Sequence, residues 1–475
     1  RRPMHFGAAF FERETGERGY KMEDTIASIA TAVGLGGIAI IRVSGPRAKD
    51  ILSRVFRPHR ANRAMTSHRL TYGEVWEGER RVDECMAVYM KAPHTYTTED
   101  VVEFQCHGGA VTAQEVLAAV LRAGARLAEP GEFTKRAFLG GRIDLAQAES
   151  VMDLISARTA RAAHASLQQM DGYLSRRIHA LQDKLLDTIA YLEATLDYPD
   201  EDIEPLTARR AAEEARAVQT ALQEAVRNAR AGRLLSAGVR IVLAGSPNTG
   251  KSSLLNCLLR EQRAIVTDVA GTTRDVLREE LDLFGLPVQL SDTAGLRSAE
   301  DAVERIGIDR AREELRRADV ALLVLDSARE LTPEERSLLR ETSVPLVVAL
   351  NKTDLNARTG VEDVRAALQG AQAFAILLTS AVTGEGIEDL RRALYEAALR
   401  GASPEEAYLT NERHVQAAKD ALAALESAVT ALEDRTLDCA ALDLRAAWEA
   451  LGAITGESAT EDVIDRIFEK FCLGK

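Results

Sequence analysis

A glycine-bounded loop near the middle of the chain has the residue types that bind nucleotide phosphates. Residues 245–252 read Gly-Ser-Pro-Asn-Thr-Gly-Lys-Ser, between an apolar run at 239–244 and a helical-looking stretch at 253–259. Glycines let backbone N–H groups turn toward an anion, and a following helix N-terminus adds partial positive charge. We expect Lys251 to neutralise the β- and γ-phosphates and the Ser252 hydroxyl to ligate Mg²⁺. Spacing and flanks together predict a phosphate-binding loop.

A second motif, Asp-Thr-Ala-Gly at 292–295, has residues that can sense a γ-phosphate. It ends an expected strand at 288–292. Asp292 can reach Mg²⁺ through water, and the N–H of Gly295 can meet the γ-phosphate. The next residue is Leu296, where many GTPases carry a glutamine that orients the attacking water. Other groups must therefore position the water in this protein.

Two further motifs select guanine among the bases. Asn-Lys-Thr-Asp at 351–354 follows an apolar run, and a carboxylate at Asp354 can accept hydrogen bonds from N1 and N2 of guanine. Adenine lacks this pair of donors, so the pairing is specific. The backbone N–H groups of Ser380 and Ala381 are expected to face the guanine O6. Four motifs in this order, each at a strand end, resemble those of the GTPase family of P-loop NTPases.

Water activation has two candidate explanations. Asn248 inside the phosphate loop, with the hydroxyl-rich loop at 267–275, offers oxygens for a K⁺ ion that would supply the charge of an arginine finger. Thr273 is expected to ligate Mg²⁺. In the alternative, Asn248 only caps its loop and Arg274 supplies charge in trans. Glu304 is a candidate for orienting water, although a lone glutamate on a charged helix also fits a solvated position.

The residues predicted to bind GTP all lie in these motifs. The candidate catalytic groups are Lys251, in the phosphate loop, and Glu304, which follows the motif at 292–295. The predicted GTP-binding set is Asn248, Thr249, Gly250, Lys251, Ser252, Ser253, Thr267, Thr272, Thr273, Asp292, Thr293, Ala294, Gly295, Asn351, Lys352, Asp354, Ser380 and Ala381.

Length and composition limit the number of domains and the class of protein. The 475 residues suggest about three domains of roughly 150 residues. A net charge of −13 disfavours a general polyanion binder without excluding a local basic patch. No apolar run reaches the ~18 residues that span a membrane. Five unclustered cysteines indicate reduced thiols in the cytoplasm. Residues 1–21 lack a signal-peptide pattern and are interpreted as a disordered extension before a natural start at Met22.

The flanking segments predict two further domains. Residues 24–126 alternate short strands with turns and then a helix, which indicates an α+β domain. Its expected elements are strands at 36–45, 84–91 and 100–109 and a helix at 110–122. Three polar residues in or at the ends of these strands, Arg42, Glu103 and His107, are interpreted from the pattern as solvated.

Long helices surround the GTPase motifs on both sides. Residues 144–231 have helical periodicity with one expected break, a loop at 197–205 with two prolines. Helical patterns return at 411–432, 438–451 and 461–471. A helical block before and after the GTPase segment predicts one all-α domain into which the GTPase domain is inserted, because the ends of an insert usually lie close together.

The chain from 22 to 475 resembles the MnmE (TrmE) family of tRNA-modification GTPases. The resemblance rests on the phosphate loop, on the 267–275 loop, on Pro-Gly-Glu-Phe-Thr-Lys-Arg-Ala-Phe-Leu from 130, on Asp-Leu-Ala-Gln-Ala-Glu from 144 and on the terminal Cys-Leu-Gly-Lys. Most other GTPases of the superfamily lack the N-terminal domain and this C-terminus.

The resemblance implies a multidomain α/β and α fold. After the extension at 1–21, it comprises an α+β tetrahydrofolate-binding and dimerisation domain at 22–140, an all-α helical bundle at 141–236 and 401–475, and a Ras-like P-loop GTPase domain at 237–400 inserted into the bundle.

The resemblance also implies ligand sets. Folate contacts are Arg42, Glu103, Arg142 and Lys475; some members carry lysine at the position of Arg142, which keeps the charge and changes the geometry. K⁺ contacts are Asn248, Thr267, Val269 and Thr272, and Mg²⁺ contacts are Ser252 and Thr273. Glu304 matches the catalytic glutamate. Cys472 matches a terminal cysteine that acts chemically or shapes the folate site.

The implied activity is GTP hydrolysis, stimulated when K⁺ pairs two GTPase domains of a homodimer. The family works with an FAD- and NADH-using protein, MnmG (GidA), as a heterotetramer that modifies C5 of the wobble uridine in certain tRNAs. The added group is aminomethyl or carboxymethylaminomethyl, and its one-carbon unit comes from 5-formyl- or methylene-tetrahydrofolate. The competing interpretations are a ribosome-assembly GTPase and a pure nucleotide-dependent switch.

Overall fold

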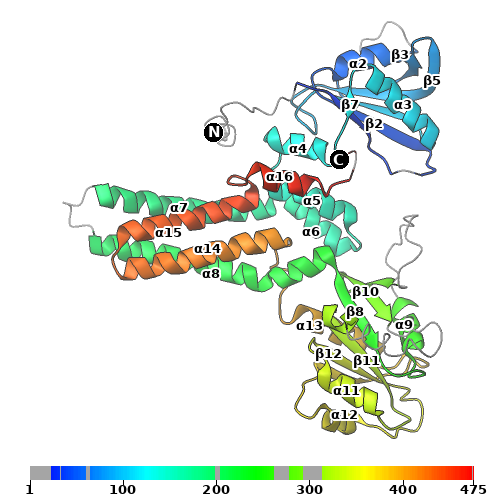
Figure 1. Ribbon diagram of the computed structural model, residues 1–475, viewed down its shortest axis with the longest axis vertical. Helices are drawn as coiled ribbons and strands as arrows, with labels where there is room; N and C mark the ends of the chain where they lie inside the picture. The colour runs from blue at the N-terminus through cyan, green and yellow to red at the C-terminus, as the bar shows by residue number, and fades with distance from the viewer. Residues whose placement is uncertain are drawn as a thin grey trace. The chain divides into compact units, whose positions relative to one another are not determined.

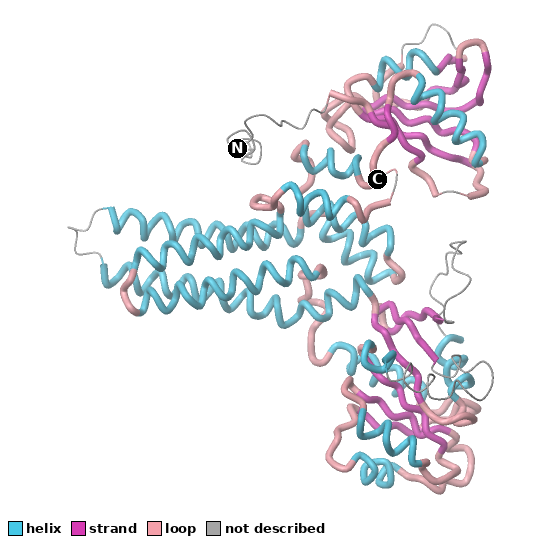
Figure 2. Tube along the Cα trace, in the orientation of Figure 1, coloured by secondary structure: helices cyan, strands magenta, loops and turns pink. Residues whose placement is uncertain are grey.

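The computed structural model describes residues 23–32, 34–59, 65–197, 204–260, 278–292, 313–472 and 474. Its contacts divide the chain into two compact units. The first contains the residues up to Met152 and from Leu451 onward, and the second contains Asp153–Ala450. Figures 1 and 2 show their helices and strands. We describe each unit by itself.

The first unit is built on a mixed sheet. Its strands are β1 (Ile26–Ile29), β2 (Ile38–Ser44), β3 (Phe56–Pro58), β4 (Thr71–Glu77), β5 (Arg80–Met90), β6 (Val101–His107) and β7 (Arg126–Leu127). Their order in the sheet is β3-β4-β5-β6-β2-β1-β7, with β1 and β7 parallel and the other neighbours antiparallel.

Strand alternation separates the two faces of this sheet. Ile41 and Val43 of β2 and Phe104 of β6 are buried in one core with apolar residues of α2 (Ala48–Val55) and α3 (Ala110–Arg122). Successive side chains in a strand point to opposite faces, so Arg42 and Glu103 lie on the other face. These two residues are direct partners in the β2–β6 register.

Helices from both ends of the chain form a second core in this unit. They are α4 (Glu132–Leu139), the start of α5 (Leu145–Ser156) and α16 (Glu461–Phe468). Leu145 and Ala148 pack with Ile464 and Phe468. The C-terminal helix is therefore part of the fold of the first unit, and its amphipathic pattern supplies the apolar side of this contact.

A buried guanidinium links α4 to the sheet. Arg136 donates to Glu99 Oε1 at 3.0 Å, to Asp24 Oδ1 at 2.8 Å and to Glu132 Oε1 at 2.9 Å. Burial alone would raise the pKa of Glu132, but hydrogen bonds from Arg126, a backbone N–H and Arg136 outweigh it and hold this pKa below its ordinary value of 4.5. The ionised carboxylate therefore stabilises the fold.

The helical part of the second unit contains long antiparallel helices. They are α6 (Ala160–Met170), α7 (Tyr173–Asp197), α8 (Glu204–Ala237), α14 (Glu412–Glu433) and α15 (Leu437–Thr455). α8 packs against α7 and against α14, and Figure 1 shows α7, α8, α14 and α15 side by side. Helices from before and after the GTPase segment thus share one bundle.

The single helical register expected from 144 to 231 is broken more often than predicted. One additional break precedes α6, where the Thr159 side chain caps the helix by accepting a hydrogen bond from Ala162 N at 3.2 Å. Another lies at Asp171–Gly172, where the positive φ of Gly172 ends α6. The expected loop at 197–205 is also too long, because Pro205 lies in the first turn of α8. Proline is tolerated there since that N–H has no partner within the helix.

The α/β part of the second unit has a six-stranded sheet of order β13-β12-β11-β8-β10-β9. The strands are β8 (Val239–Ala244), β9 (Arg278–Leu283), β10 (Leu286–Asp292), β11 (Val320–Asp326), β12 (Leu346–Asn351) and β13 (Ala375–Leu378). Neighbours pair in parallel except β9, which is antiparallel to β10.

Helices cover both faces of this sheet. One core takes residues from α9 (Lys251–Arg260) and α13 (Ile387–Leu399), and the other from α11 (Pro333–Glu341) and α12 (Val361–Leu368). β8 has β10 on one side and β11 on the other, so the loop after β8 lies where the strand order reverses, the usual ligand position in such sheets. This confirms the predicted fold class, and the domain boundaries remain a prediction.

Two sequence-based interpretations concern membranes and thiols. Among the described helices, none has the length and apolar content to cross a bilayer. The five cysteines have no disulfide partner in the described part of the chain. Burial raises the pKa of Cys85 to about 12 and that of Cys106 to about 11, so both remain thiols. The region 1–21, interpreted as a disordered extension, lies outside the described residues.

Replacing Glu132 with glutamine tests the buried network. Because the folded-state pKa of Glu132 is depressed, its contribution is present above the ordinary value and is lost as pH falls through the folded value. We expect Glu132→Gln to lower the unfolding free energy of the first unit by about 2 kcal/mol near neutral pH. The variant should also lose less stability than the parent on acidification, as measured by urea denaturation across pH.

The matched control is Glu213→Gln, which removes an exposed carboxylate paired with Arg209. It should change the unfolding free energy by less than about 0.5 kcal/mol. An acid profile of Glu132→Gln that matches that of the parent protein would contradict the role assigned to this carboxylate.

Candidate functional site

The loop after β8 has a backbone that only glycine permits at its two ends. Gly245 has φ +139°, and a Cβ there would lie 2.3 Å from the carbonyl oxygen of Val324. Gly250 has φ +92°, and a Cβ there would lie 2.4 Å from Nδ2 of Asn351. α9 begins at Lys251, two residues before the expected start at Ser253, so the helix N-terminus opens inside the motif.

The predicted phosphate-binding side chains lie around this loop. Lys251 is buried and its Nζ donates to the carbonyl oxygens of Gly245 at 2.9 Å and Ser246 at 2.8 Å. The buried Thr249 hydroxyl donates to Ser246 O at 3.0 Å. Ser252 and Ser253 are exposed in the first turn of α9. The ammonium thus lies within the curl of the loop, where it can meet a phosphate.

Asn351 connects the phosphate loop to the base-recognition loop. This side chain is 1% exposed at the end of β12. Its Nδ2 donates to Thr249 O at 3.0 Å, and its Oδ1 accepts from Ala381 N at 3.1 Å. One amide therefore fixes two loops that come from different strands, and both of its polar ends are used.

Asp354 and Ser380 also meet at the base end. The buried Ser380 hydroxyl donates to Asp354 Oδ1 at 2.6 Å, which orients the exposed carboxylate. A carboxylate has capacity for further hydrogen bonds, so it can still receive N1–H and N2–H of guanine. The Ala381 N–H already donates to Asn351, so a guanine O6 would share this donor.

Lys352 follows Asn351 with φ +66° and lies across the phosphate loop. Its Nζ donates to Asn248 O and to Asp326 Oδ2, each at 2.7 Å. Asp326 holds this lysine in place and was missed by the sequence analysis. The signal was available, because Asp326 ends the apolar strand β11 as the predicted motifs end theirs.

The γ-phosphate side of the site is described only at its edge. Asp292 ends β10 opposite Leu243 of β8, which places its backbone beside the phosphate loop. The other predicted residues of this side lie outside the described residues: Thr267, Val269, Thr272, Thr273, Thr293, Ala294, Gly295 and Glu304.

Of the residues predicted to bind Mg²⁺ and K⁺, the structure describes Ser252 and Asn248, and both are compatible with a cation. Mg²⁺ binds hard oxygen ligands, and the exposed Ser252 hydroxyl opens α9 beside the loop. Asn248 is exposed at the loop tip with φ +65°, and Lys352 holds its carbonyl, so the side-chain amide is not needed for that contact. Within the described ranges, no group of three or more histidine, cysteine, aspartate or glutamate side chains could hold a metal.

The first unit brings together a second set of predicted residues. Arg42 Nε donates to Glu103 Oε1 at 2.8 Å, and both side chains are less than one-fifth exposed. This cross-strand pair corrects the interpretation of Arg42 and Glu103 as solvated. Arg142 donates to Thr95 O at 3.2 Å. The ring of Tyr96 lies 5.8 Å from the Arg42 guanidinium and 5.0 Å from that of Arg142.

The C-terminus reaches the same place. Arg42 NH1 donates to Gly474 O at 3.5 Å. Gly474 has φ +91°, and a Cβ there would lie 2.4 Å from Ile29 O in β1, so only glycine permits this approach. The Cys472 side chain is exposed, and its backbone carbonyl oxygen accepts a hydrogen bond from Gly131 N at 3.4 Å. Lys475 lies outside the described residues.

The structure agrees with the sequence interpretation of His107 and adds Tyr96 to the cluster. His107 is exposed at the end of β6, as predicted, and pairs with Asp83 at 2.7 Å. Tyr96 was not predicted, although it is the aromatic residue between two predicted folate ligands. Nothing in its local sequence marks it, because its position follows from contacts with residues far along the chain.

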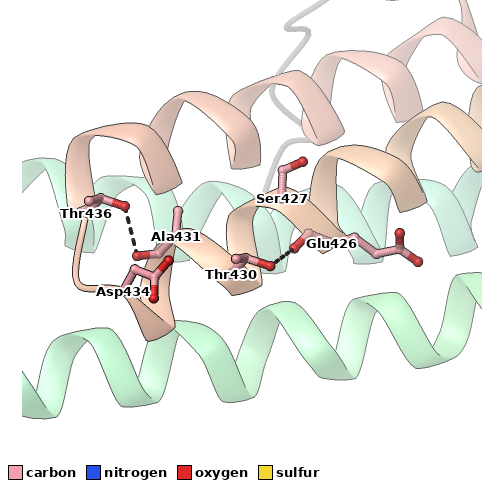
Figure 3. Close-up of a pocket in the computed structure, with 6 residues that line it drawn as sticks. All are labelled: Glu426, Ser427, Thr430, Ala431, Asp434 and Thr436. Carbon is pink, nitrogen blue, oxygen red and sulfur yellow. Dashed lines mark hydrogen bonds between the residues drawn. The ribbon is translucent and has the colours of Figure 1, made fainter.

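A shallow hollow on α14 is a separate feature (Figure 3). It is lined by Glu426, Ser427, Thr430, Ala431, Asp434 and Thr436. The Thr430 hydroxyl donates to Glu426 O and the hydroxyl of Thr436, in the turn after α14, donates to Ala431 O, as Figure 3 shows. Two carboxylates and no cationic side chain line this hollow, so it is unsuited to a phosphate.

Replacing Asp354 with asparagine tests the base contact. The carboxylate is predicted to accept from two donors of guanine, whereas an asparagine N–H₂ would face the guanine N–H groups. We expect at least about 100-fold weaker GTP binding. Xanthosine triphosphate, which carries a carbonyl in place of the 2-amino group, should bind the variant better than the parent does. Titration with fluorescent nucleotide analogues measures both affinities.

Asp389→Asn on the exposed first turn of α13 is the matched control. It should leave both affinities unchanged. Equal GTP affinity in the parent and in Asp354→Asn would remove this carboxylate from base recognition.

Known proteins match almost the whole chain. The family model of the MnmE helical domain matches residues 145–472, and that of the GTP-binding protein TrmE N-terminus matches residues 25–142. Curated relatives named tRNA modification GTPase MnmE include one from Heliobacterium modesticaldum, 47% identical over 95% of this chain and 99% of its own. One from Bacillus subtilis is 44% identical over 95% of this chain and 100% of its own.

Among solved structures, the G domain of the T. maritima FeoB iron transporter aligns with 34% of this chain and 98% of its own, at 27% identity and a TM-score of 0.25. The extent of the curated matches and the helical-domain match over more than half of the chain decide the assignment. This chain belongs to the tRNA modification GTPase MnmE family.

Proposed function

We propose that this protein is a K⁺-stimulated GTPase that modifies C5 of the wobble uridine of certain tRNAs with a folate one-carbon unit. The observation that carries the proposal is the convergence of Arg42, Glu103 and Arg142 beside the C-terminal Gly474, in a chain that also carries a complete set of guanine-nucleotide motifs. The curated relatives named tRNA modification GTPase supply the link to tRNA.

GTP hydrolysis is supported by the arrangement at the ends of β8, β10 and β12. Lys251 lies in the loop that would hold the phosphates, and Asp354 is oriented for the base. Leu296 replaces the glutamine that often orients water. We therefore assign this task to Glu304, with Lys251 neutralising phosphate charge.

A cation beside the phosphates would supply the remaining positive charge. We assign Mg²⁺ to Ser252 and Thr273, and K⁺ to Asn248, Thr267, Val269 and Thr272. Charge stabilisation by such an ion replaces that of an arginine finger. The exposed position of Asn248 at the loop tip is compatible with this role.

Folate binding is supported by the chemistry of the first-unit cluster. The amide and amino groups of a pterin offer two adjacent N–H donors, which a carboxylate such as Glu103 matches. The guanidinium groups of Arg42 and Arg142 suit the carboxylates of a folate, and Lys475 would add a further cation. Exposed Cys472 lies beside Gly131 next to this cluster and would contribute chemically or by shaping the site.

The remaining parts of the proposal follow the family. The protein would act in the cytoplasm as a homodimer with an FAD-dependent MnmG-like protein, in a heterotetramer that binds tRNA and adds an aminomethyl or carboxymethylaminomethyl group. A ribosome-assembly GTPase or a pure nucleotide switch would have no use for the cluster around Glu103.

Glu103→Gln tests the one-carbon role directly. The glutamine side chain has one acceptor oxygen and an N–H₂ group that would face the second N–H donor, so we expect at least about tenfold weaker binding of 5-formyltetrahydrofolate. GTP turnover of the same variant should stay within about twofold of the parent value, because Glu103 lies outside the GTPase motifs. Calorimetry measures folate binding, and mass spectrometry of tRNA nucleosides from cells with this variant as the sole copy should show loss of the wobble modification.

Glu79→Gln, in the exposed turn before β5, is the matched control and should keep folate affinity and modification. Undiminished modification in Glu103→Gln would contradict the folate assignment. Glu304→Ala should show the opposite result for GTP: it should bind GTP and fail to hydrolyse it.

The cation assignment is tested by comparing GTP turnover in KCl and NaCl at equal ionic strength. We expect turnover at least about tenfold faster in KCl. Asn248→Gly should abolish the difference, since glycine keeps the positive φ and removes the side-chain oxygen. Asn256→Gly, on the exposed side of α9, is the control for glycine itself. Equal rates of the parent in both salts would favour Arg274 or a partner protein as the source of charge.

A further inference from the structure

The turn between β9 and β10 is docked on the start of helix α6. The Thr159 hydroxyl donates to Gly285 O at 2.8 Å, and Arg161 NH1 donates to Phe284 O at 3.3 Å. Beside the turn, Arg158 pairs with Glu280 of β9 at 2.7 Å. Three polar residues within four positions of one helix start thus bind one hairpin of the nucleotide-binding sheet.

This contact is closely fitted. Gly285 has φ +89°, and a Cβ there would lie 2.7 Å from Cδ and 2.9 Å from Cβ of Arg161. Phe284 also has a positive φ, of 53°, which turns its ring toward α13. The ring packs edge-on against Tyr395 at 5.5 Å between centroids, and the Arg391 guanidinium lies 5.2 Å from its centre. A bulkier or shifted turn would not fit here.

Arg161 connects the turn with two other segments. Its NH1 also donates to the Tyr395 hydroxyl at 3.2 Å, and its NH2 pairs with Glu405 at 2.5 Å. Tyr395 belongs to α13 and Glu405 to the segment that leads from α13 to α14. The planar guanidinium has several donors in fixed directions, which a single ammonium group cannot replace.

In the sequence, the other end of the hairpin leads into two predicted nucleotide-binding motifs. β9 begins at Arg278, shortly after Thr273, and β10 ends at Asp292, the first residue of the γ-phosphate motif. The two strands pair continuously from Leu283↔Leu286 to Arg278↔Ser291. A paired hairpin moves as a body, because sliding one strand would break its hydrogen bonds and reverse its faces. A shift at the nucleotide end therefore displaces the turn at α6.

We propose that Arg161 is a positioning residue that couples the nucleotide-binding sheet to the helical bundle through the β9–β10 turn. This inference rests on the proposed function and deepens it, because it names the contact through which GTP hydrolysis would act on the rest of the enzyme. Arg161 lies outside the residues predicted to bind GTP or folate. It would transmit a displacement of the β9–β10 turn to α6, the helix to which it belongs.

Hydrogen–deuterium exchange of the full-length protein tests the proposal. We would compare the protein with GDP and with GDP plus aluminium fluoride, and follow peptides that cover α6. In the parent we expect exchange rates in α6 to differ at least about threefold between the two nucleotide states. In Arg161→Ala this difference should fall below about 1.5-fold, while nucleotide affinity stays within about twofold.

Two further variants separate coupling from stability. Tyr395→Phe removes only the hydroxyl that accepts from Arg161 and should reduce the nucleotide-dependent difference without lowering the melting temperature. Arg209→Ala, an exposed bundle arginine paired with Glu213, should leave the difference unchanged. A purely structural role of Arg161 would lower protection in both nucleotide states equally.

The proposal is overturned if α6 of the parent exchanges at the same rate in both states. It is also overturned if the difference persists in Arg161→Ala. Failure of the proposed function has another signature, namely a parent protein that binds and hydrolyses GTP without any effect on wobble modification. The exchange experiment does not depend on tRNA, so the two failures are distinguishable.

Discussion

The nucleotide site depends on one buried amide, that of Asn351. Parallel strands bring their carboxyl ends to the same edge of a sheet, but they do not fix the loops that follow. Asn351 holds the phosphate loop through Thr249 O and the base loop through Ala381 N. Gly250 leaves room for this side chain, because a Cβ there would meet its Nδ2. The glycine at position 250 and the asparagine at position 351 are therefore required together, because the second fits only where the first lacks a side chain.

A comparable constraint organises the first unit, although it acts across a sheet. Arg42 and Glu103 are opposite each other in antiparallel strands, on the face away from the α2–α3 core. Two charged partners at that position stabilise each other and remain accessible to a ligand with donors and acceptors of its own. Gly474 joins the cluster because, as a glycine, it can approach β1. A site made in this way combines residues from both ends of the chain.

The nucleotide site is built from local motifs and the first-unit cluster from distant strands, and this difference decides what the sequence could predict. The GTP motifs are local, since each consists of a strand and the loop directly after it, so the positions of the described motif residues Lys251, Asn351 and Asp354 at strand ends could be predicted from the sequence. Arg42 and Glu103 were interpreted as solvated from the pattern alone, because their partnership depends on the register of strands far apart in the sequence. Tyr96 and Arg161 were missed for the same reason. The breaks around α6 were predictable in principle, since Thr159 is a favourable N-cap and Gly172 a helix terminator.

The break before α6 allows Thr159 to contact the β9–β10 turn. The Thr159 side chain can cap a helix only where a helix starts. Ending α5 and starting α6 at this point frees the hydroxyl to accept from Ala162 N and to donate to Gly285 O. The cap that starts the helix is thus also the contact to the β9–β10 turn. Any displacement of that turn acts on the first turn of α6, where backbone N–H groups have the fewest partners and a helix opens most readily.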